Sequence, residues 1–349
     1  MGRLIAITEP GITVGLHGER LVLRRGGREG EQFRLAEVDQ LLLFGPVEVT
    51  HAALMRLLAH GIDVVYLTGA GSFRGRLQGP MGRQIDLRLA QFERLRDESF
   101  ALALSRQLVA GKIANQRRLL VRVQQSLADE QISVDLLALR HRWRDALAAR
   151  DREELLGVEG AAAAAYFRAF GRSIKNPLFS FSGRTRRPPK DPINACLSFG
   201  YALVGTLLDG DVAAAGFDPM LGALHQPAYG RPSLSLDLLE EFRPVLVDAL
   251  VLRLINRRQL VPADFASPSE ALGEDQLVVD DAPMEGAVYL AATGRKVFLA
   301  EFLRRLREQA FYAPGGGRYT YREIMRQQVY QLARVIKGEV DVYRPFEMR

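Results

Sequence analysis

Apolar residues alternate with polar residues over short distances in the first eighty positions of the chain. Apolar runs of strand length lie at residues 4–8, 13–16, 20–24, 38–44 and 62–67. His17-Gly18-Glu19 provides a hairpin turn between the second and third of these runs. Residues 50–59 instead carry apolar side chains at helical spacing, and Thr50 is placed as the N-cap. The pattern predicts a β-rich unit with one helix, in which residues 69–79 form a loop or an edge hairpin.

The hydrophobic period changes at Gly79-Pro80. From residue 83 to about residue 127, apolar side chains recur at helical spacing, and the same period returns at residues 136–150, 159–170, 193–205 and 235–256. Pro244 is expected to kink the last of these helices. We therefore predict an α+β multidomain protein, with a small β-rich domain at residues 1–82 and a large all-α domain at residues 83–349.

Composition narrows the class of protein. The chain has 349 residues, of which 48% are hydrophobic and 25% charged, as in ordinary globular proteins. No uncharged run of eighteen apolar residues predicts a membrane span, and the first ten residues lack a signal peptide. The single cysteine, Cys196, excludes a disulfide framework and a cysteine-based zinc site. We expect a cytoplasmic protein.

The net charge of +6 and the sequence pI near 9.6 favour an anionic partner. Only five of the 47 basic residues are lysines. Arginine suits bidentate contacts with phosphate, although a GC-rich genome produces the same bias. Four cations gather in the segment 181–192, namely Arg184, Arg186, Arg187 and Lys190. This segment is either a phosphate clamp or a solvated loop.

The sequence lacks the common catalytic motifs. It contains no G-x-x-x-x-G-K-[ST] phosphate loop, no G-x-S-x-G nucleophile elbow and no H-E-x-x-H helix. Three separate segments instead carry candidate groups. Glu159 precedes a run of alanines, His225 ends the segment 216–225, and Asp237 is followed by Glu240 and Glu241.

Each of these groups also has an ordinary structural interpretation. Glu159 in a first helical turn would interact with the helix dipole, and a lone histidine is usually structural. Asp237 with Glu240 or Glu241 puts two carboxylates on one helix face, as at many acidic helix starts. Two carboxylates and one imidazole nevertheless form a donor set suited to Mg²⁺ or Mn²⁺, and Mn²⁺ tolerates the imidazole more readily. Spacing alone does not assemble this set.

At these residues the sequence resembles the CRISPR-associated integrase family, the larger and catalytic subunit of the spacer-acquisition complex. The resemblance covers nearly the whole chain, through residues 157–167, 191–201 (DPINACLSFGY), 216–225 (GFDPMLGALH), 231–244 (RPSLSLDLLEEFRP) and 343–346 (YRPF). It implies an N-terminal β-domain that mediates dimerisation and a C-terminal helical catalytic domain. It also implies that two such homodimers flank a small ferredoxin-like partner dimer in a hetero-hexamer.

The resemblance also implies roles for particular residues. By motif position, Glu159, His225 and Glu240 correspond to the metal ligands. Asp237 is the accessory acid beside them, and Asn194 makes a polar contact in the same site. Tyr166 lies near the site as a DNA contact. Arg243 either contacts the scissile phosphate or pairs with a carboxylate.

The implied reaction is transesterification. A 3′-hydroxyl of a short DNA duplex attacks a phosphodiester in a CRISPR array, and a divalent ion neutralises the developing charge. One ester replaces another, so the reaction requires no ATP. The same site working with water would be a metal-dependent DNA endonuclease. A third hypothesis, from another class, is an architectural DNA-binding subunit in which the acidic cluster is merely structural.

Overall fold

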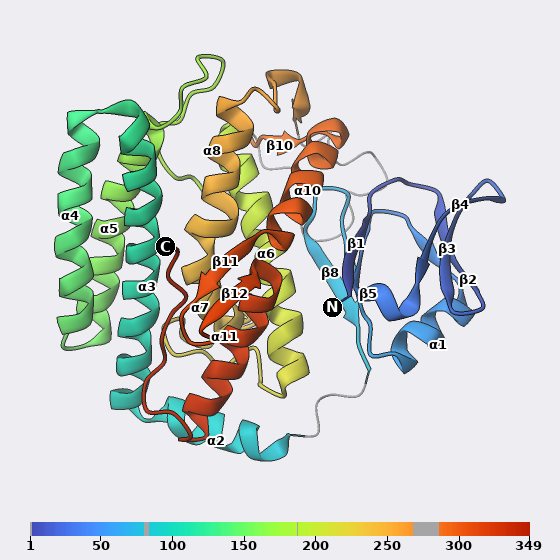
Figure 1. Cartoon of the computed structure of the whole chain (residues 1–349), viewed down its shortest axis with the longest axis horizontal. Helices are drawn as coiled ribbons and strands as arrows, with labels where there is room; N and C mark the ends of the chain where they lie inside the picture. Colours follow the sequence, from blue (N-terminus) through green and yellow to red (C-terminus); the bar gives the residue numbers. More distant parts are fainter. Residues whose placement is uncertain (1, 80–83, 187, 268–285) are drawn as a thin grey trace.

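The computed structural model describes residues 2–79, 84–186, 188–267 and 286–349. Figure 1 shows a β-rich N-terminal lobe lying beside a larger helical lobe. The elements of the first lobe are β1 (Arg3–Ile7), β2 (Ile12–His17), β3 (Arg20–Arg25), β4 (Arg28–Arg34), η1 (Leu35–Glu37), β5 (Val38–Phe44), β6 (Glu48–Val49), α1 (His51–Ala59), β7 (Asp63–Leu67) and β8 (Phe73–Leu77).

Two four-stranded sheets build this lobe. One has the order β1-β5-β7-β8, with β8 as its antiparallel edge strand, and the other has the order β4-β3-β2-β6. Strand β5 is buried on both faces: Leu41 and Leu43 join the core of the N-terminal lobe, and Leu42 and Phe44 join the core of the helical lobe. The predicted N-cap of α1 is confirmed, because Ala53 donates its backbone N–H to Thr50 Oγ1 at 3.3 Å.

The second lobe is predominantly helical. Its helices are α2 (Ile85–Arg96), α3 (Glu98–Leu127), α4 (Glu130–Ala148), α5 (Arg152–Arg172), α6 (Pro192–Ala215), α7 (Ser233–Phe242), η2 (Arg243–Asp248), α8 (Ala249–Asn256), η3 (Pro262–Asp264), α10 (Ala292–Arg307) and α11 (Tyr321–Ile336). The prediction that this lobe is all-α is wrong. The short strand β9 (Phe265–Ala266) pairs with β10 (Tyr289–Leu290), and β11 (Gln309–Tyr312) pairs with β12 (Gly317–Thr320).

Two predicted helices are interrupted. In the segment predicted as helical from residue 83 to about residue 127, the described residues form α2 and α3. These helices separate at Asp97, because its carboxylate accepts the Ser99 N–H and caps α3. The segment 235–256 is interrupted by the π-helical turn η2 at the expected Pro244, which has no N–H to donate. The predicted domain boundary at residue 82 lies outside the described residues, between β8 and α2.

Helix α6 joins the two lobes. Its Asp209 carboxylate lies 2.5 Å from the Arg76 guanidinium of β8, and Arg76 also donates to the Thr206 carbonyl. Among the described residues, α6 alone is long and apolar enough to cross a membrane, but 72% of its apolar window is buried inside the protein. This burial is typical of a core helix, and α6 packs against α7, η2 and α11.

Candidate functional site

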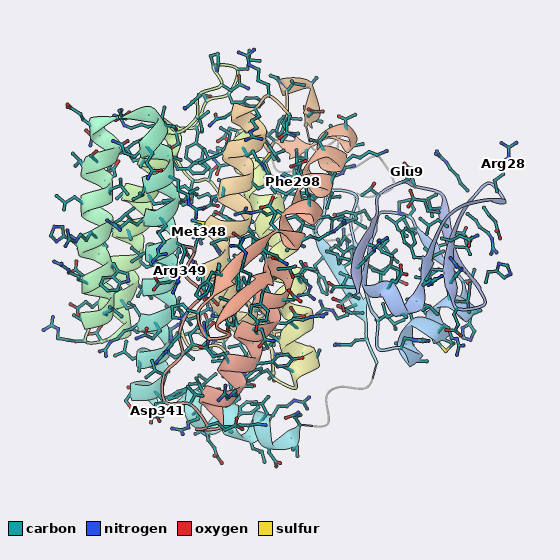
Figure 2. All side chains as sticks on the ribbon, viewed as in Figure 1. Glu9, Arg28, Phe298, Asp341, Met348 and Arg349 are labelled. Carbon is teal, nitrogen blue, oxygen red and sulfur yellow. The ribbon has the colours of Figure 1, made fainter. Side chains whose placement is uncertain are left out.

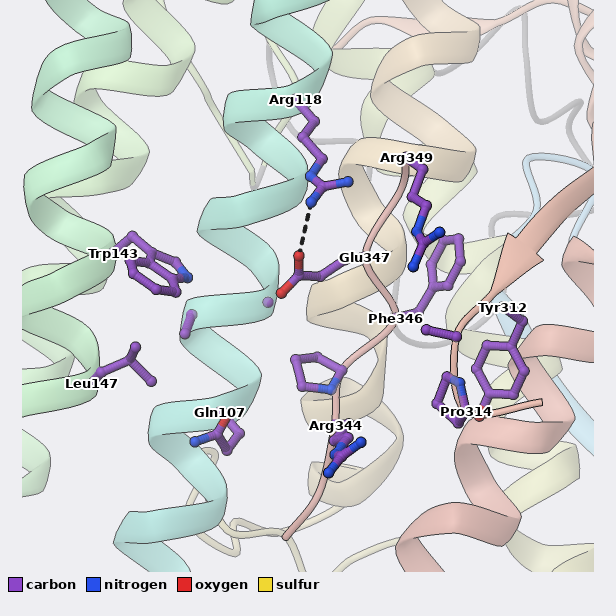
Figure 3. A pocket seen from close by; sticks show the side chains of 14 residues that line it. Gln107, Arg118, Trp143, Leu147, Tyr312, Pro314, Arg344, Phe346, Glu347 and Arg349 are labelled. Carbon is purple, nitrogen blue, oxygen red and sulfur yellow. Dashed lines mark hydrogen bonds and ion pairs between the residues drawn. The ribbon is translucent and has the colours of Figure 1, made fainter. Parts of the chain in front are cut away.

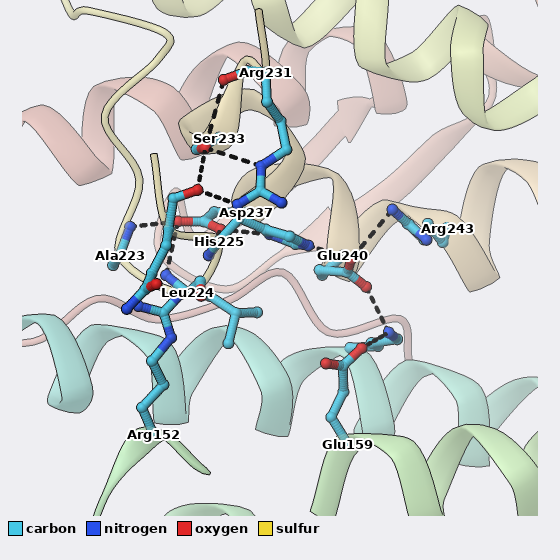
Figure 4. A network of polar contacts seen from close by, with 12 residues as sticks. Arg152, Glu159, Ala223, Leu224, His225, Arg231, Ser233, Asp237, Glu240 and Arg243 are labelled. Carbon is cyan, nitrogen blue, oxygen red and sulfur yellow. Dashed lines mark hydrogen bonds and ion pairs between the residues drawn. The ribbon is translucent and has the colours of Figure 1, made fainter. Parts of the chain in front are cut away.

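Helices α3, α5 and α7 converge on one polar cluster inside the helical lobe (Figure 4). Glu159 lies two turns into α5, which begins at Arg152 and is capped by Asp151. The first-turn interpretation of Glu159 is therefore wrong, and the helix dipole does not account for this carboxylate. Glu240 comes from α7, and His225 comes from the loop that precedes α7.

A lysine that we did not predict occupies the centre of the cluster. Lys112 Nζ of α3 lies 2.6 Å from Glu159 Oε1 and 2.6 Å from Glu240 Oε2. Only the contact with Glu159 has hydrogen-bond geometry, so the buried Glu240 Oε2 has no aligned donor. The ammonium group thus fills a cation position between two of the predicted metal ligands.

The charges in this cluster stabilise one another. Burial raises the pKa of Glu240, but Arg243 and Lys112 outweigh burial and hold that pKa well below its usual range. Burial likewise lowers the pKa of Lys112, but Glu240 and Glu159 outweigh it and raise that pKa. Glu240, only 2% exposed, is therefore a carboxylate at neutral pH, although burial alone would protonate it.

Asp237 fixes the orientation of His225. Its carboxylate accepts the backbone N–H groups of Ala223 at 2.6 Å, Leu224 at 3.0 Å and His225 at 2.9 Å. His225 Nδ1 lies 2.7 Å from Asp237 Oδ1 and is assigned as the N–H that donates to it. The lone pair of Nε2 then faces Glu240 Oε1, which is 3.9 Å away. A carboxylate behind a histidine is the usual support for a metal-binding imidazole.

The donor set fits a divalent metal ion. Lys112 bridges the carboxylates of Glu159 and Glu240, and the imidazole Nε2 of His225 lies 3.9 Å from the other oxygen of Glu240, so two carboxylates and one imidazole nitrogen are linked through Glu240. In the described part of the chain, no three side chains of His, Cys, Asp or Glu are close enough to hold an ion as they stand. We attribute this spacing to Lys112, whose ammonium group occupies the centre.

Glu241 lies on the other side of α7. Its carboxylate accepts hydrogen bonds from Tyr343 Oη and Gln328 Nε2 and does not face the Lys112 cluster. The helical pattern left open which of Glu240 and Glu241 faces the predicted metal. Glu240, and not Glu241, contacts Lys112 and lies near His225.

Asn194 supports a loop rather than the predicted ligands. Its Oδ1 accepts from Arg184 at 2.8 Å and from the Thr185 N–H at 3.0 Å, and its Nδ2 donates to the Gly183 carbonyl. These bonds hold the segment 183–185 against the first turn of α6. None of the hydrogen bonds that Asn194 makes to described residues involves a predicted metal ligand.

Tyr166 does not fit its predicted role. The side chain is fully buried, and its hydroxyl donates to Asp248 at 2.6 Å, as the Tyr201 hydroxyl does from α6. The predicted DNA contact of Tyr166 is contradicted, because Tyr166 lies on the buried, alanine-rich face of α5 and its ring is not accessible. Burial raises the pKa of Asp248 to about 6.

The predicted phosphate-binding cations have separate positions. Arg243 pairs with Glu240 at 3.2 Å and lies over the Tyr201 ring, so it fits the carboxylate-pairing alternative. Arg184 lies over the same ring, whereas Arg186 and Lys190 are exposed. Arg187 lies outside the described residues.

The comparisons with known proteins cover most or all of the chain. Residues 5–304 match the family described as CRISPR associated protein Cas1. A CRISPR-associated endonuclease Cas1 of Thermus thermophilus is 36% identical over 335 residues, covering 95% of this chain and 93% of the relative. The chain also matches a CRISPR-associated exonuclease Cas4/endonuclease Cas1 fusion of Geobacter sulfurreducens, with 34% identity over 100% of this chain, but spans only 61% of that fusion.

Two solved structures share the fold. A casposase bound to its integration product superposes with a TM-score of 0.80 at 22% identity, covering 99% of this chain and 94% of the casposase chain. A chain of a Cas6-RT-Cas1–Cas2 complex gives a TM-score of 0.78 at 25% identity, covering 99% of this chain and 36% of that one. The chain thus has the fold class that these two structures share. Within this class it belongs to the Cas1 family, which confirms the resemblance found in the sequence.

Proposed function

We propose that this chain is a divalent-metal-dependent DNA integrase that inserts short DNA duplexes into a CRISPR array. The observation that carries the proposal is the cation position between Glu159 and Glu240, which Lys112 occupies, with His225 Nε2 3.9 Å from Glu240 Oε1. The endonuclease names of its relatives and the integration product of the casposase support DNA as the substrate.

The reaction we propose is transesterification. A 3′-hydroxyl forms a new ester with a target phosphate while the existing ester breaks, and the displaced strand leaves with its own 3′-hydroxyl. An Mg²⁺ or Mn²⁺ ion held by Glu159, His225 and Glu240 would neutralise charge on the phosphate and acidify the attacking hydroxyl. The number of phosphate esters is unchanged, which agrees with a sequence that lacks an ATP-binding phosphate loop.

The chain's own residues prepare this site. Asp237 presents Nε2 of His225, and Arg243 keeps Glu240 ionised. Lys112 bridges the two carboxylates, and its ammonium group would have to move aside for Glu159 and Glu240 to hold a metal ion. The buried setting strengthens each of these electrostatic interactions.

A basic loop beside the site is suited to the DNA backbone. A pocket between α5 and the segment 181–186 is lined by four arginines, Arg168, Arg172, Arg184 and Arg186. We propose that Arg184, Arg186 and Lys190 contact phosphates of the incoming duplex.

The assembly we propose follows the family. The chain would form a homodimer through its N-terminal lobe, and two dimers would flank a small ferredoxin-like partner dimer in a hetero-hexamer. The fold is shared with a chain of a Cas6-RT-Cas1–Cas2 complex, which supports a Cas2 partner. Light scattering of the chain alone and with a purified Cas2 would test both assemblies.

Hydrolysis is a second candidate reaction, because the relatives are named endonucleases. The same site would then activate water instead of a 3′-hydroxyl. Measuring strand joining and strand cleavage on one branched substrate separates the two reactions. The architectural alternative predicts DNA binding without metal and no change in phosphodiester bonds under any divalent ion.

His225→Ala is the most direct test of the proposed site. This variant should fold and bind DNA normally but lose half-site integration with Mn²⁺ or Mg²⁺, because Nε2 is the only nitrogen of the donor set. His141→Ala, at an exposed histidine of α4, is the matched control. Full strand joining by His225→Ala would refute the proposal.

A further inference from the structure

The family-like motif at residues 343–346 takes no part in the site described above. Residues 343–348 form an extended segment, which we call the C-terminal strap. It buries Tyr343, Phe346 and Met348 at 2% exposure each and leaves Arg344 and Glu347 exposed. Figure 2 labels Asp341 before the strap, near the end of α11, and Met348 at its far end, in the middle of the helical lobe.

The backbone of the strap is satisfied by side chains instead of a neighbouring strand. Asn115 of α3 donates to the Phe346 carbonyl at 2.8 Å and accepts the Met348 N–H at 2.8 Å. Gln328 of α11 donates to the Arg344 carbonyl at 3.2 Å. Buried peptide groups that are paired with specific side chains fix one register for the segment.

Glu241 is the anchor of the strap on α7. It accepts from Tyr343 Oη at 2.7 Å, from Gln328 Nε2 at 2.9 Å and from the Phe346 N–H. Phe346 also stacks on Phe242, with ring centroids 6.0 Å apart. The residues that follow Glu240 are therefore held by the strap, while Glu240 itself faces Lys112.

One face of α3 contacts both the site and the strap. Lys112 and Asn115 are three residues apart and so lie on the same side of the helix. Besides its bonds to the strap, Asn115 Nδ2 donates to the Glu241 carbonyl in the last turn of α7, just before the π-helical turn. Asn115 thus ties α3, α7 and the strap together one turn from the cation position.

Gly111 shows how closely the strap approaches α3. A Cβ atom at this position would lie 2.4 Å from Pro345 Cβ, too close for any side chain. Figure 3 shows the strap beside α3, where Arg118 of α3 forms an exposed ion pair with Glu347 of the strap. This exposed pair links Glu347 of the strap to α3 and does not involve Glu241.

We propose that the C-terminal strap orients α7 so that Glu240 faces the metal position, and that Glu241 and Asn115 are positioning residues for the reaction. The proposal rests on the proposed function, because Glu240 must be a metal ligand. Releasing the strap would let α7 rotate or shift at η2, where the π-helical turn already widens the helix.

Three strap variants of the full chain test this proposal. Gly111→Ala displaces Pro345. Glu241→Gln puts an amide N–H donor next to the three groups that donate to Glu241. Tyr343→Phe removes the hydrogen bond from the Tyr343 hydroxyl to Glu241 and keeps the aromatic ring. We expect each to lower the affinity for Mn²⁺, by about tenfold for Gly111→Ala and Glu241→Gln and by less for Tyr343→Phe. DNA affinity and the KM for DNA should be unchanged, and strand joining should recover at high Mn²⁺.

Glu347→Gln is the control, because it breaks only the exposed pair with Arg118 and should leave the Mn²⁺ affinity unchanged. Calorimetric titration with Mn²⁺ in the absence of DNA, well below the melting temperature of every variant, measures these affinities. If all three strap variants bind Mn²⁺ as the parent does while Glu240→Gln loses it, the strap proposal is wrong and the metal site stands. If Glu240→Gln also keeps the parent affinity, both proposals fail.

Discussion

Glu240 and Glu241 are neighbours with identical side chains, yet they occupy opposite electrostatic environments. Glu240 is surrounded by Lys112, Arg243 and His225, which hold its pKa below the usual range. Glu241 is surrounded by neutral donors, and burial raises its pKa to about 7 against their hydrogen bonds. Burial opposes ionisation at both carboxyl groups, so the difference comes from the formal charges on the two sides of α7.

This difference suits Glu240 to a reactive site and Glu241 to a structural role. A carboxylate kept ionised by nearby cations can exchange one of those cations for a metal ion without first losing a proton. A carboxyl group held by a tyrosine, a glutamine and a backbone N–H provides directional bonds and offers no cation position. The same substitution, glutamate to glutamine, is therefore expected to have different effects at Glu240 and at Glu241.

The largest expected difference is between Glu240→Gln and Glu241→Gln. Glu240→Gln should lower strand joining by more than about a thousandfold at any Mn²⁺ concentration, because it removes a proposed ligand at the reacting phosphate. Glu241→Gln should recover most of the parent rate at saturating Mn²⁺. Half-site integration rates across a Mn²⁺ titration test both, and equal losses in the two variants would remove the distinction.

Lys112→Met should destabilise the metal-free protein by about 3–5 kcal/mol, because it leaves Glu159 and Glu240 buried without their shared cation. Added Mn²⁺ should restore more stability to this variant than to the parent. Urea unfolding with EDTA and then with Mn²⁺ measures both effects, and Lys337→Met at an exposed position is the control. An Mn²⁺-independent loss would show that Lys112 does not share its position with the metal.

Glu241 should make stability fall as pH rises. Its pKa is raised from 4.5 to about 7, so the folded protein holds a proton that the unfolded chain releases above pH 4.5. Its contribution is complete below pH 4.5 and is lost as pH rises to about 7, a change of at most about 3 kcal/mol. The pKa of Asp248 is raised to about 6, so Asp248 also makes the free energy of unfolding fall as pH rises.

Urea unfolding of the parent and of Glu241→Gln between pH 5 and pH 8 isolates this contribution from that of Asp248. The difference in unfolding free energy between the two proteins should shrink toward high pH, where the parent loses its advantage. A difference that stays constant with pH would show that the Glu241 pKa is not raised.

Asp237→Asn should lower Mn²⁺ affinity by about 10- to 100-fold, because the amide no longer enforces the tautomer that presents His225 Nε2. Asp145→Asn, at an exposed carboxylate of α4, is the matched control. Calorimetric titration with Mn²⁺ measures both variants. Parent-like affinity in Asp237→Asn would mean that Nε2 is not a ligand.

The smallest expected effect concerns the basic loop. Reversing the charge of Arg186 and of Lys190 should flatten the dependence of DNA binding on salt, with the slope falling by about one for each phosphate that the loop no longer binds. Fluorescence anisotropy over a range of salt concentrations measures the slope. An unchanged slope would show that the loop is only solvated.

The order of lobes, most strands and the N-cap Thr50 were predictable, because they follow from local apolar spacing and cap chemistry. Strand β4 (Arg28–Arg34) was missed, since almost all of its side chains are exposed and no apolar period marks it. The break at Asp97 was missed because apolar spacing continues across it. The two short hairpins of the helical lobe were missed because strands of two to four residues carry too little pattern.

The candidate site was only partly predictable. Spacing placed Asp237 and Glu240 on one helix, but only the resemblance to the family joined them to Glu159 and His225. Lys112 was overlooked, although its position among Leu108, Asn115 and Leu119 on one helix face was a signal of a buried cation. Its partners lie 47 and 128 residues away in sequence, so nothing local identifies them.

The central claim is that Glu159, His225 and Glu240 bind one divalent ion in place of the Lys112 ammonium. Anomalous diffraction from crystals soaked in Mn²⁺ tests it directly. We predict one peak bounded by Glu159, Glu240 and His225 Nε2, with Lys112 Nζ moved out of the centre. A peak elsewhere, or no peak and an undisturbed Lys112, would contradict the account.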